Sequence, residues 1–442
     1  MSDVKLTSLK SSSLQNSVNA VSAEHPFVYD MEKSTVPVAT EMIKINPDSA
    51  LQSGASVQTL TYRLPASGFL VDFYHKLTHE VGPDGTQSRE SESAEGLYAF
   101  ENFTLTTRDV EIARFHPLGL HAELLKSKNE TDFKIAVNFP AIYNGIKNVA
   151  GTASYYSPLG GLTWVGARPS DSLDLQFLEN VYLNARLRPC VDVKHTTAGA
   201  ANEWTDAGLY MKFVKMLESD YQDYLNANYD ENKALTKMIW THYPENPKSQ
   251  AIEGVAGNTF SITTDINVPH YVVETVVAVR DKSNDSEDSG STTGKKGGKR
   301  KYFPIKDIKL SANGKNIVDM NDDAMGDRVA LQKARKDNTI LFPGSENWIY
   351  KNGGNLVQSA SANSFMTIDY RLLNRQSSDQ ENSADNLEGG VSMGALSSKQ
   401  ITVKFECDSA DVSDVELLVV HKCVNLVSVD ARNGSVSVST RS

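Results

Sequence analysis

The chain has 442 residues, and at roughly 100–200 residues per domain this length predicts two domains. Hydrophobic residues make up 40% and charged residues 22%, a globular composition that excludes a largely disordered chain. Asp and Glu number 55 against 44 Lys and Arg, so the net charge is −11. Nucleic-acid binding without sequence preference needs a basic surface, so the charge argues against that class of function. We expect no sequence-specific nucleic-acid binding either.

Cysteine usage and hydropathy predict a protein that is not secreted. Cys190, Cys407 and Cys423 are too few for a disulfide framework and lack the C-x-x-C spacing of structural zinc. The first 25 residues contain no apolar stretch typical of a secretory signal. The longest apolar runs, Val415–Val420 and Tyr271–Val279, are far shorter than the about 20 residues that span a bilayer.

Residues 1–25 are polar and Ser-rich, with apolar residues at loosely helical spacing. This pattern leaves two interpretations open, a frayed terminus or an arm that becomes ordered along a partner.

From about residue 55 the pattern is that of β-strands. Residues 57–64 and 69–74 are rich in β-branched and aromatic side chains, and Pro65–Gly68 between them is a turn. Residues 82–96 form a polar loop, and Gly and Pro then recur at short intervals up to about residue 208. Many short strands separated by turns predict a sandwich or a barrel.

Residues 219–243 have a different pattern. Ser219 to Gln222 has the form of a capping box, and apolar residues follow at helical spacing before Pro244. We predict one or two helices here, joining two β domains.

The second half repeats the style of the first. Strand patterns recur up to Asn433-Gly434, a strong two-residue hairpin signal. Residues 69–75 match 271–277 in character, and 101–106 match 306–311, at offsets of roughly 200 residues. We therefore predict an arm at 1–36, a first β domain at 37–246 that ends in the helical linker 219–243, and a second β domain at 247–442.

One fragment fits a catalytic motif. Gly390–Gly394 reads G-x-S-x-G around Ser392, and Asp408, Asp411 and His421 follow in hydrolase order. That motif needs a strand before the serine and a helix after it, whereas a polar loop precedes this one and a strand follows. We interpret it as a loop of small residues and predict no catalytic residue.

Two other fragments lack essential residues of the motifs they resemble. Gly290–Lys296 has one residue too few between its glycines for a phosphate loop, and a lysine where Ser or Thr binds magnesium. The segment that begins at Asp319 has Ala324 and Ala330 where a calcium loop needs Gly and Glu.

His75 and His79, with Glu80, have the spacing of two metal ligands. H-E-x-x-H is not present, and spacing indicates no third ligand. The sequence therefore predicts no metal and no cofactor.

One dense basic cluster lies in the low-complexity segment 283–301, which lacks large apolar residues. Its charges suit contact with phosphates or acidic headgroups, or they keep a long hairpin loop solvated beside its acidic half, Asp285–Asp288. We favour the second interpretation. The cluster consists of Lys295, Lys296, Lys299, Arg300 and Lys301.

The remaining pattern, a large acidic two-domain β protein with long polar loops, resembles the double jelly-roll major capsid proteins of tailless icosahedral viruses, the lineage of PRD1, adenovirus and large DNA viruses. Gly208–Leu217 is similar to the last strand of a first roll. Phe303–Lys315 is similar to an early strand pair of a second roll, and Leu417–Leu426 to a closing strand. The resemblance covers residues 55–442.

The resemblance implies an all-β fold with a few helices, in which two tandem jelly rolls are antiparallel β-sandwiches. It implies a structural, non-enzymatic protein whose homotrimers are pseudo-hexagonal capsomers that tile an icosahedral shell. The candidate outward loops are 82–96, 283–301 and 376–396. Two segments depart from the expected pattern. These are the polar stretch 187–207 and residues 320–337, which have the pattern of a helix inserted in the second roll.

The resemblance also implies partners and a location. The partners are further copies of the chain, other capsid proteins such as penton or minor proteins, and an internal viral membrane near the N-terminal arm. The location is the virion, after synthesis in the host cytoplasm or at an assembly site. Two alternatives stay open, a minor virion protein such as a penton or spike, and a carbohydrate-binding β-sandwich module.

Overall fold

The computed structural model places two sets of antiparallel strands in tandem. It describes residues 38–52, 56–66, 68–81, 95–127, 151–159, 173–178, 180–189, 202–216, 218–219, 234–282, 303–321, 348–350, 356–358, 365–370, 390–407, 412–430 and 435–440.

The first set of strands forms two sheets that enclose one core. One sheet has the order β1-β9-β3-β6, with β7 paired to β3, and the other has the order β2-β8-β4-β5. The strand bounds are β1 Val38–Ile45, β2 Gln58–Arg63, β3 Phe69–Val81, β4 Phe100–Thr107, β5 Val110–Phe115, β6 Gly151–Pro158, β7 Leu173–Asp174, β8 Val181–Leu187 and β9 Asn202–Met216. The helices are α3 Glu95–Tyr98, α4 Pro117–Ser127 and α6 Leu175–Leu178.

The second set of strands also forms two main sheets. One has the order β10-β21-β13-β18, joined by β11, β19 and β22, and the other has the order β12-β20-β14-β15. The bounds are β10 Ala234–Pro244, β11 Lys248–Ala251, β12 Thr259–Asp265, β13 Tyr271–Asp281, β14 Ile305–Ala312, β15 Lys315–Asn321, β18 Phe365–Asp369, β19 Val391–Ser392, β20 Gln400–Glu406, β21 Asp414–Asp430 and β22 Val436–Thr440. This half of the chain also contains a short hairpin, formed by β16 Trp348–Tyr350 and β17 Leu356–Gln358, and the 3-10 helix η4, Met393–Ala395.

The two sets share one connectivity. In each, the first, eighth, third and sixth main strands form one sheet, and the second, seventh, fourth and fifth form the other. This order is that of a jelly roll, two Greek keys folded into a sandwich. We call β1–β9 the first roll and β10–β22 the second roll. The prediction of two tandem antiparallel jelly rolls is confirmed.

Fine details of the two rolls also coincide. The β4–β5 hairpin turns through Arg108 and Asp109, with φ of 47° and 66°, and the β14–β15 hairpin through Asn313 and Gly314, with φ of 52° and 75°. Three register shifts recur at matching places as well. These pairs are Leu70/Asp72 with Val272/Glu274, Phe100/Asn102 with Ile305/Asp307, and Leu105/Thr106 with Leu310/Ser311. Matching register shifts are separated by 202 residues in the first pair and by 205 in the other two. The offset of roughly 200 residues seen in the sequence therefore reflects an internal structural repeat.

The predicted helical linker at 219–243 is wrong in its second part. Residues 234–244 form β10, which pairs with β21 from Ala234↔Asp430 to Pro244↔Val420. The run Ile239–Tyr243 is rich in β-branched and aromatic residues, and its pairing with a strand distant in sequence overrides the helical spacing. Because β10 lies in a sheet of the second roll, the last strand of the first roll is β9, which ends at Met216.

Alternation of apolar residues sets the inward faces of most strands. In β20, Ile401, Val403 and Phe405 are fully buried, while Gln400 and Lys404, on the other face of the strand, are exposed. Removing one such large side chain from water stabilises the fold by about 1.5–3 kcal/mol. The strands therefore have one dry face and one wet face, as a sandwich requires.

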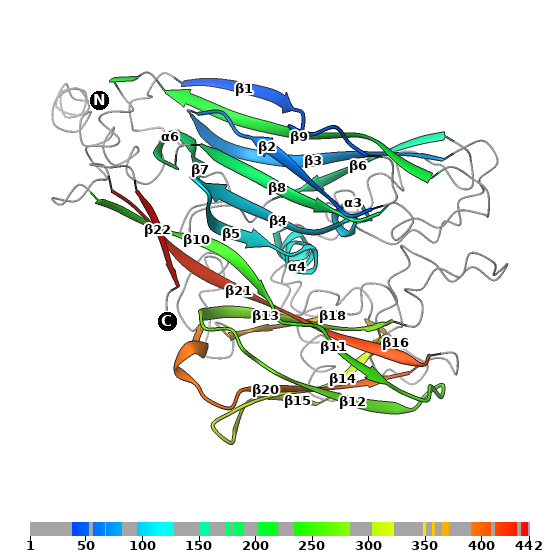
Figure 1. Cartoon of the computed structure of the whole chain (residues 1–442). Helices are drawn as coiled ribbons and strands as arrows, with labels where there is room; N and C mark the ends of the chain where they lie inside the picture. Colours follow the sequence, from blue (N-terminus) through cyan, green and yellow to red (C-terminus); the bar gives the residue numbers. More distant parts are fainter. Residues whose placement is uncertain are drawn as a thin grey trace, which may run out of the picture.

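Strands β13 and β21 lack this alternation because both of their faces are covered. Val277 and Val419 belong to the core of the second roll, whereas Val276 and Val420 belong to a core continuous with the first roll. The four sheets are stacked as layers in Figure 1, with β1 at the top and the β12–β15 sheet at the bottom. The continuous apolar runs noted in the sequence are thus the layer where the rolls meet.

Several sequence predictions lie outside the described residues. These are the N-terminal arm, residues 82–94 of the first loop, the low-complexity segment 283–301, the loop 376–389 and the inserted helix from residue 322 onward. In the described part of the chain, no helix is long and apolar enough to cross a membrane.

Candidate functional site

The first part of the candidate site is the contact between the two rolls. Strand β5 is the edge strand of its sheet, so one row of its backbone groups lacks a partner strand. Side chains of the second roll meet that row. The Arg114 amide donates to Thr241 Oγ1 at 3.0 Å, and Asn425 Nδ2 donates to the Ile112 carbonyl at 3.0 Å.

Helix α4 follows β5 and supplies the charged part of the contact. Glu123 Oε1 lies 3.1 Å from His242 Nε2 and 3.2 Å from Lys422 Nζ, and Lys422 lies over the Trp240 ring at 4.3 Å. The His116 amide donates to His242 Nδ1 at 3.1 Å. Since Nδ1 accepts, Nε2 carries the proton and donates to Glu123.

The same helix covers an apolar surface on the second roll. Leu118 of α4 shares one core cluster with Val276, Leu418 and Val420. A side-chain carbon on Gly119 would lie 2.5–2.8 Å from the His242 ring, so glycine is what lets α4 approach the sheet this closely. The contact between the rolls therefore has the dry, interlocked character of a core.

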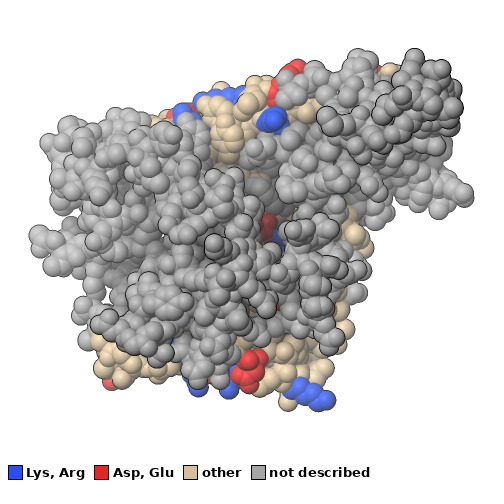
Figure 2. Space-filling view, turned by 180° about the vertical axis from the view of Figure 1, so that it is seen from behind, with Lys and Arg blue, Asp and Glu red and all other residues tan. Residues whose placement is uncertain are grey.

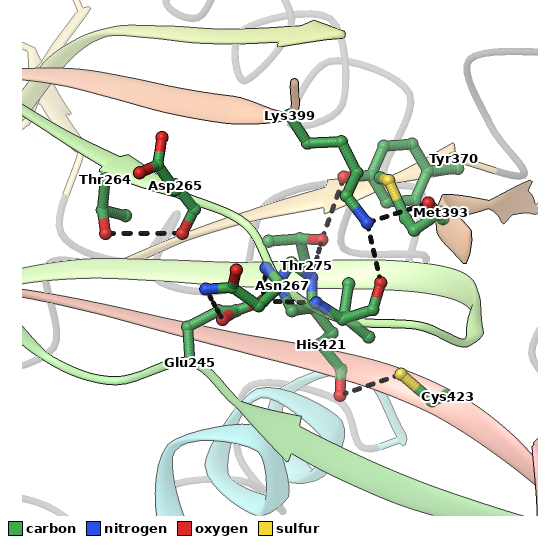
Figure 3. A network of polar contacts seen from close by, with 11 residues as sticks. Glu245, Thr264, Asp265, Asn267, Thr275, Tyr370, Met393, Lys399, His421 and Cys423 are labelled. Carbon is green, nitrogen blue, oxygen red and sulfur yellow. Dashed lines mark hydrogen bonds and ion pairs between the residues drawn. The ribbon is translucent and has the colours of Figure 1, made fainter. Parts of the chain in front are cut away.

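The second part of the candidate site is a buried polar cluster around Glu245, at the end of β10 (Figure 3). Glu245 Oε1 accepts hydrogen bonds from the backbone amides of Asn267 at 2.8 Å and Val268 at 2.9 Å. Lys399 Nζ donates to the carbonyls of Val268 and Met393 at 3.0 and 2.9 Å. The cluster thus fixes the segment between β12 and β13.

A chain of hydrogen bonds continues into the core of the second roll. Tyr370 Oη lies 2.9 Å from Thr275 Oγ1, which lies 2.8 Å from His421 Nδ1 (Figure 3). His421 Nε2 lies 3.4 Å from Glu245 Oε1. The two hydrogen bonds are consistent if the protons run from Tyr370 through Thr275 to His421 Nδ1, which leaves the proton of the neutral imidazole on Nε2, the atom that faces Glu245.

Burial and these contacts shift the pKa values of the cluster. Burial lowers the pKa of His421 and outweighs the opposing effect of Glu245, so the imidazole is neutral at pH 7. Burial alone would raise the pKa of Glu245, but the hydrogen bonds from His421, Asn267 and Val268 lower it overall. An ionised Glu245 that accepts two backbone amides and a neutral His421 bound to Thr275 thus hold the end of β10 and the segment before β13 together.

The histidine of the first roll with a predicted metal-ligand spacing is also structural. His75 is fully buried, and its Nε2 lies 2.6 Å from Tyr62 Oη. Burial lowers the pKa of His75 to about 3. Within the described ranges, no group of three or more His, Cys, Asp or Glu side chains is arranged to hold a metal ion.

The two described residues of the serine-hydrolase fragment, Ser392 and His421, take part in other contacts. Ser392 pairs with Tyr271 in the short strand β19, and η4 follows it. His421 is bound to Thr275 and lies beside Glu245, as described above, and Asp408 and Asp411 lie outside the described residues. The interpretation of a small-residue loop fits the backbone of residues 390–396.

Other sequence candidates fall at different places. Asp319 of the calcium-like segment lies in β15, where Asn316 Nδ2 donates to it at 3.0 Å. The basic cluster, Lys295 to Lys301, lies outside the described residues.

Sequence reasoning missed both parts of the site. Glu123, His242 and Lys422 are far apart in the chain, and a single polar residue in a strand gives no pairing signal. The sequence gives no indication that Glu245 is buried at the end of a strand, because its pattern predicts a helix for the residues before it. Thr275, between Glu274 and Val276 in an apolar strand, was the available signal for a buried polar contact.

The fold defined by these layers is that of viral double jelly-roll capsid proteins. The chain is similar to a solved PBCV-1 virus capsid protein, with a TM-score of 0.62 and 11% identity over 94% of this chain and 99% of that one. It is similar to the Faustovirus major capsid protein (TM-score 0.53, 10% identity, 90% and 92% covered) and the mavirus major capsid protein (TM-score 0.52, 11% identity, 93% and 92% covered). No family model and no curated protein matches the sequence.

Proposed function

We propose that this protein is a viral major capsid protein that self-assembles as homotrimeric, pseudo-hexagonal capsomers tiling an icosahedral shell. The observation that carries the proposal is the double jelly-roll fold, which aligns with the PBCV-1 capsid protein over nearly the whole of both chains. Two similar rolls in one chain give a trimer six similar units, which is the geometry of a hexagonal tile.

The site described above supports a structural role. Its charged groups have partners within the protein: Glu123 binds Lys422 across the two rolls, and Glu245 binds backbone amides. We therefore propose that the protein is not an enzyme and needs no cofactor. Replacing Ser392 with alanine should leave any background ester turnover unchanged, and loss of turnover would contradict this.

The proposal includes the parts that surround the rolls. Residues 1–36 would be an arm on the inner face of the shell, near neighbouring capsomers or an internal membrane. The boundary between the two domains, predicted at 246/247, would move to between β9 and β10, so that β10 belongs to the second roll. Other partners would be penton or minor capsid proteins. The basic cluster Lys295–Lys301 would stay solvated on an exposed loop. The protein would be made in the host cytoplasm or at an assembly site and reside in the virion.

Two alternative functions, a minor virion protein and a carbohydrate-binding module, can each be distinguished from the proposed one by experiment. A minor virion protein such as a penton or spike would be a small fraction of the particle mass. A carbohydrate-binding β-sandwich would bind glycans as a monomer, and a glycan array would detect that binding.

The first test is to express the full chain and image the product by negative-stain electron microscopy. The second is to measure the fraction of the total protein mass that this chain contributes in purified particles. Pseudo-hexagonal particles, with this chain as the dominant particle protein, are expected. Particles in which the chain is a trace component, or glycan binding by a monomer, would overturn the proposal.

A further inference from the structure

The last strand of the chain, β22, lies at an edge of its sheet. It pairs with β21 along its whole length, and among the described residues it has no second partner strand. The Asp430 amide donates to the Ser435 carbonyl at 3.0 Å, and hydrogen-bonded pairs alternate along an antiparallel ladder. The backbone N–H and C=O groups of Val436, Val438 and Thr440 therefore point away from β21, to the open edge.

Strand β22 differs in composition from the other edge strands. Its sequence is V-S-V-S-T, whereas edge strands are usually protected by a charged residue, a Pro or a bulge. Every other described edge strand of five or more residues has such a charge or Pro. Examples are Glu41 in β1, Arg63 in β2, Glu111 in β5, Pro158 in β6, Lys237 in β10, Asp265 in β12, Lys315 in β15 and Asp369 in β18. Charged atoms also mark the top and bottom of the molecule in Figure 2, where the two outer sheets lie. The edge of β22 is thus open and uncharged.

The two faces of β22 have different surroundings. Val436 and Val438 pack against the core cluster that extends into the first roll, while Ser437 and Ser439 are exposed. A strand laid against the open edge would continue both faces, with alternate side chains on the core side. The edge therefore suits an extended segment with large apolar residues at alternate positions, the mode of recognition in which a strand is added to a sheet.

The N-terminal arm contains such a segment. The residues before β1, which begins at Val38, lie outside the described residues. In residues 1–37, Phe27–Tyr29 is the one run of three consecutive β-branched or aromatic residues. From Tyr29 to Val38 the chain advances nine positions, which reach about 30 Å when extended.

The distance to be crossed is shorter than this reach. The start of β1 and the whole of β22 lie at the same end of the stack, at the left of Figure 1, with β1 in the first layer and β22 in the third. Stacked sheets are about 10 Å apart, so two layers amount to about 20 Å. Ile43 and Ile45 of β1 also pack against the same core cluster as Val436 and Val438. The arm of one chain is therefore long enough to reach its own β22.

We propose that Phe27–Tyr29 adds to the open edge of β22 in the same chain as an extra strand. The rings of Phe27 and Tyr29 would lie on the core side, beside the valines of β22, and aromatic with β-branched is a favourable cross-strand combination. The added strand would cover an edge that could otherwise bind another copy. The inference goes beyond the proposed function, because both segments belong to one chain and their pairing needs no assembled shell.

Thiol cross-linking in the full chain tests this contact. Val28→Cys combined with Ser437→Cys, treated with a flexible bismaleimide, should give a linked pair of peptides. Mixing isotope-labelled with unlabelled protein beforehand shows by mass spectrometry whether the two peptides come from one chain. Val28→Cys with Ser261→Cys is the matched control and should not link, because Ser261 is also exposed but lies in β12, in the outer sheet of the second roll.

Three cross-linking results would overturn the proposal. The first is the absence of a link in the Val28→Cys, Ser437→Cys protein. The second is a link between labelled and unlabelled chains, which would show that the arm of another copy covers the edge. The third is a dimer formed by Ser437→Cys alone, which would show that two β22 strands pair with each other.

Hydrogen exchange measures the added strand without a cross-linker. The amides of Val436 and Val438 should exchange at least about tenfold more slowly in the unsubstituted protein than in Val28→Pro, because proline removes a donor and disrupts pairing. Val21→Pro, in the same arm but outside the run, is the control and should leave the exchange unchanged. Equal exchange in all three proteins would overturn the proposal. Because the pairing lies within one chain, its failure would leave the proposed capsid function untouched, and a monomeric protein would still show it.

Discussion

Asn425 in β21 donates its side-chain Nδ2 proton to the carbonyl of Ile112 in β5, at 3.0 Å and 313 positions away in the chain. An edge strand normally leaves its outer carbonyls to water. Here a side chain of the second roll occupies that place. The rolls are therefore joined by hydrogen bonds as well as by apolar packing, and the joint can be weakened one bond at a time.

Replacing Asn425 with alanine should lower the free energy of unfolding by about 1–2 kcal/mol, because the buried Ile112 carbonyl loses its donor. Urea unfolding measures this. Asn316→Ala is the matched control, since exposed Asn316 makes a bond of the same length to Asp319. Equal losses in the two variants would contradict a specific role for Asn425.

Gly119→Ala should destabilise the protein although alanine is the better helix former by about 1 kcal/mol. The added carbon would lie 2.5–2.8 Å from the His242 ring, which binds the His116 amide and Glu123. The check is a double-mutant cycle with His242→Ala, measured by urea unfolding. In the His242→Ala background the glycine substitution should become neutral or stabilising, and an unchanged penalty would contradict the steric account.

Glu245→Ala should cost about 3 kcal/mol of stability, because the buried amides of Asn267 and Val268 both lose their acceptor. Glu245→Gln keeps one carbonyl oxygen and should cost less. Glu253→Ala, at an exposed position, is the control and should change stability by no more than about 0.5 kcal/mol. Thermal and urea unfolding should show the largest loss of stability for Glu245→Ala, a smaller loss for Glu245→Gln, and a stability for Glu253→Ala close to that of the unsubstituted protein.

Stability should fall as the pH drops from 7 to 5. Burial lowers the pKa of His75 and of His121 to about 3, well below the ordinary value of 6.5, so between these values the unfolded chain binds protons that the folded chain does not. Each such histidine contributes a slope of up to about 1.4 kcal/mol per pH unit. His270 and His421, whose pKa values are also lowered, act in the same direction.

Urea unfolding at pH 7, 6 and 5 measures this loss. The pKa of Glu245 is lowered from 4.5, so its contribution is lost only at more acidic pH and does not enter this window. His121→Gln should reduce the slope. A stability that stays flat down to pH 5 would show that the buried histidines do not control the acid response.

The duplicated β architecture was predictable from sequence because it rests on local patterns. Alternation in residues 401–405 and turn residues such as Asn313-Gly314 are determined by neighbours in the chain. The matches of 69–75 with 271–277 and of 101–106 with 306–311 lie in strands that the structure makes equivalent, β3 with β13 and β4 with β14. Propensity and periodicity suffice for such features.

The joint between the rolls was not predictable in this way. Strand β10 has helix-compatible spacing, and its pairing with a strand about 190 residues later decides its conformation. Glu123 and Lys422 are ordinary surface residues in sequence and become partners only when α4 is laid on β21. Contacts that depend on the packing of whole layers leave no local signature.

The most direct test of the central claim is the mass of the purified full-length protein by light scattering after size exclusion. The account predicts a trimer of about 145 kDa, three times the chain mass of 48.5 kDa. A species that stays at 48.5 kDa across the accessible concentration range would contradict it.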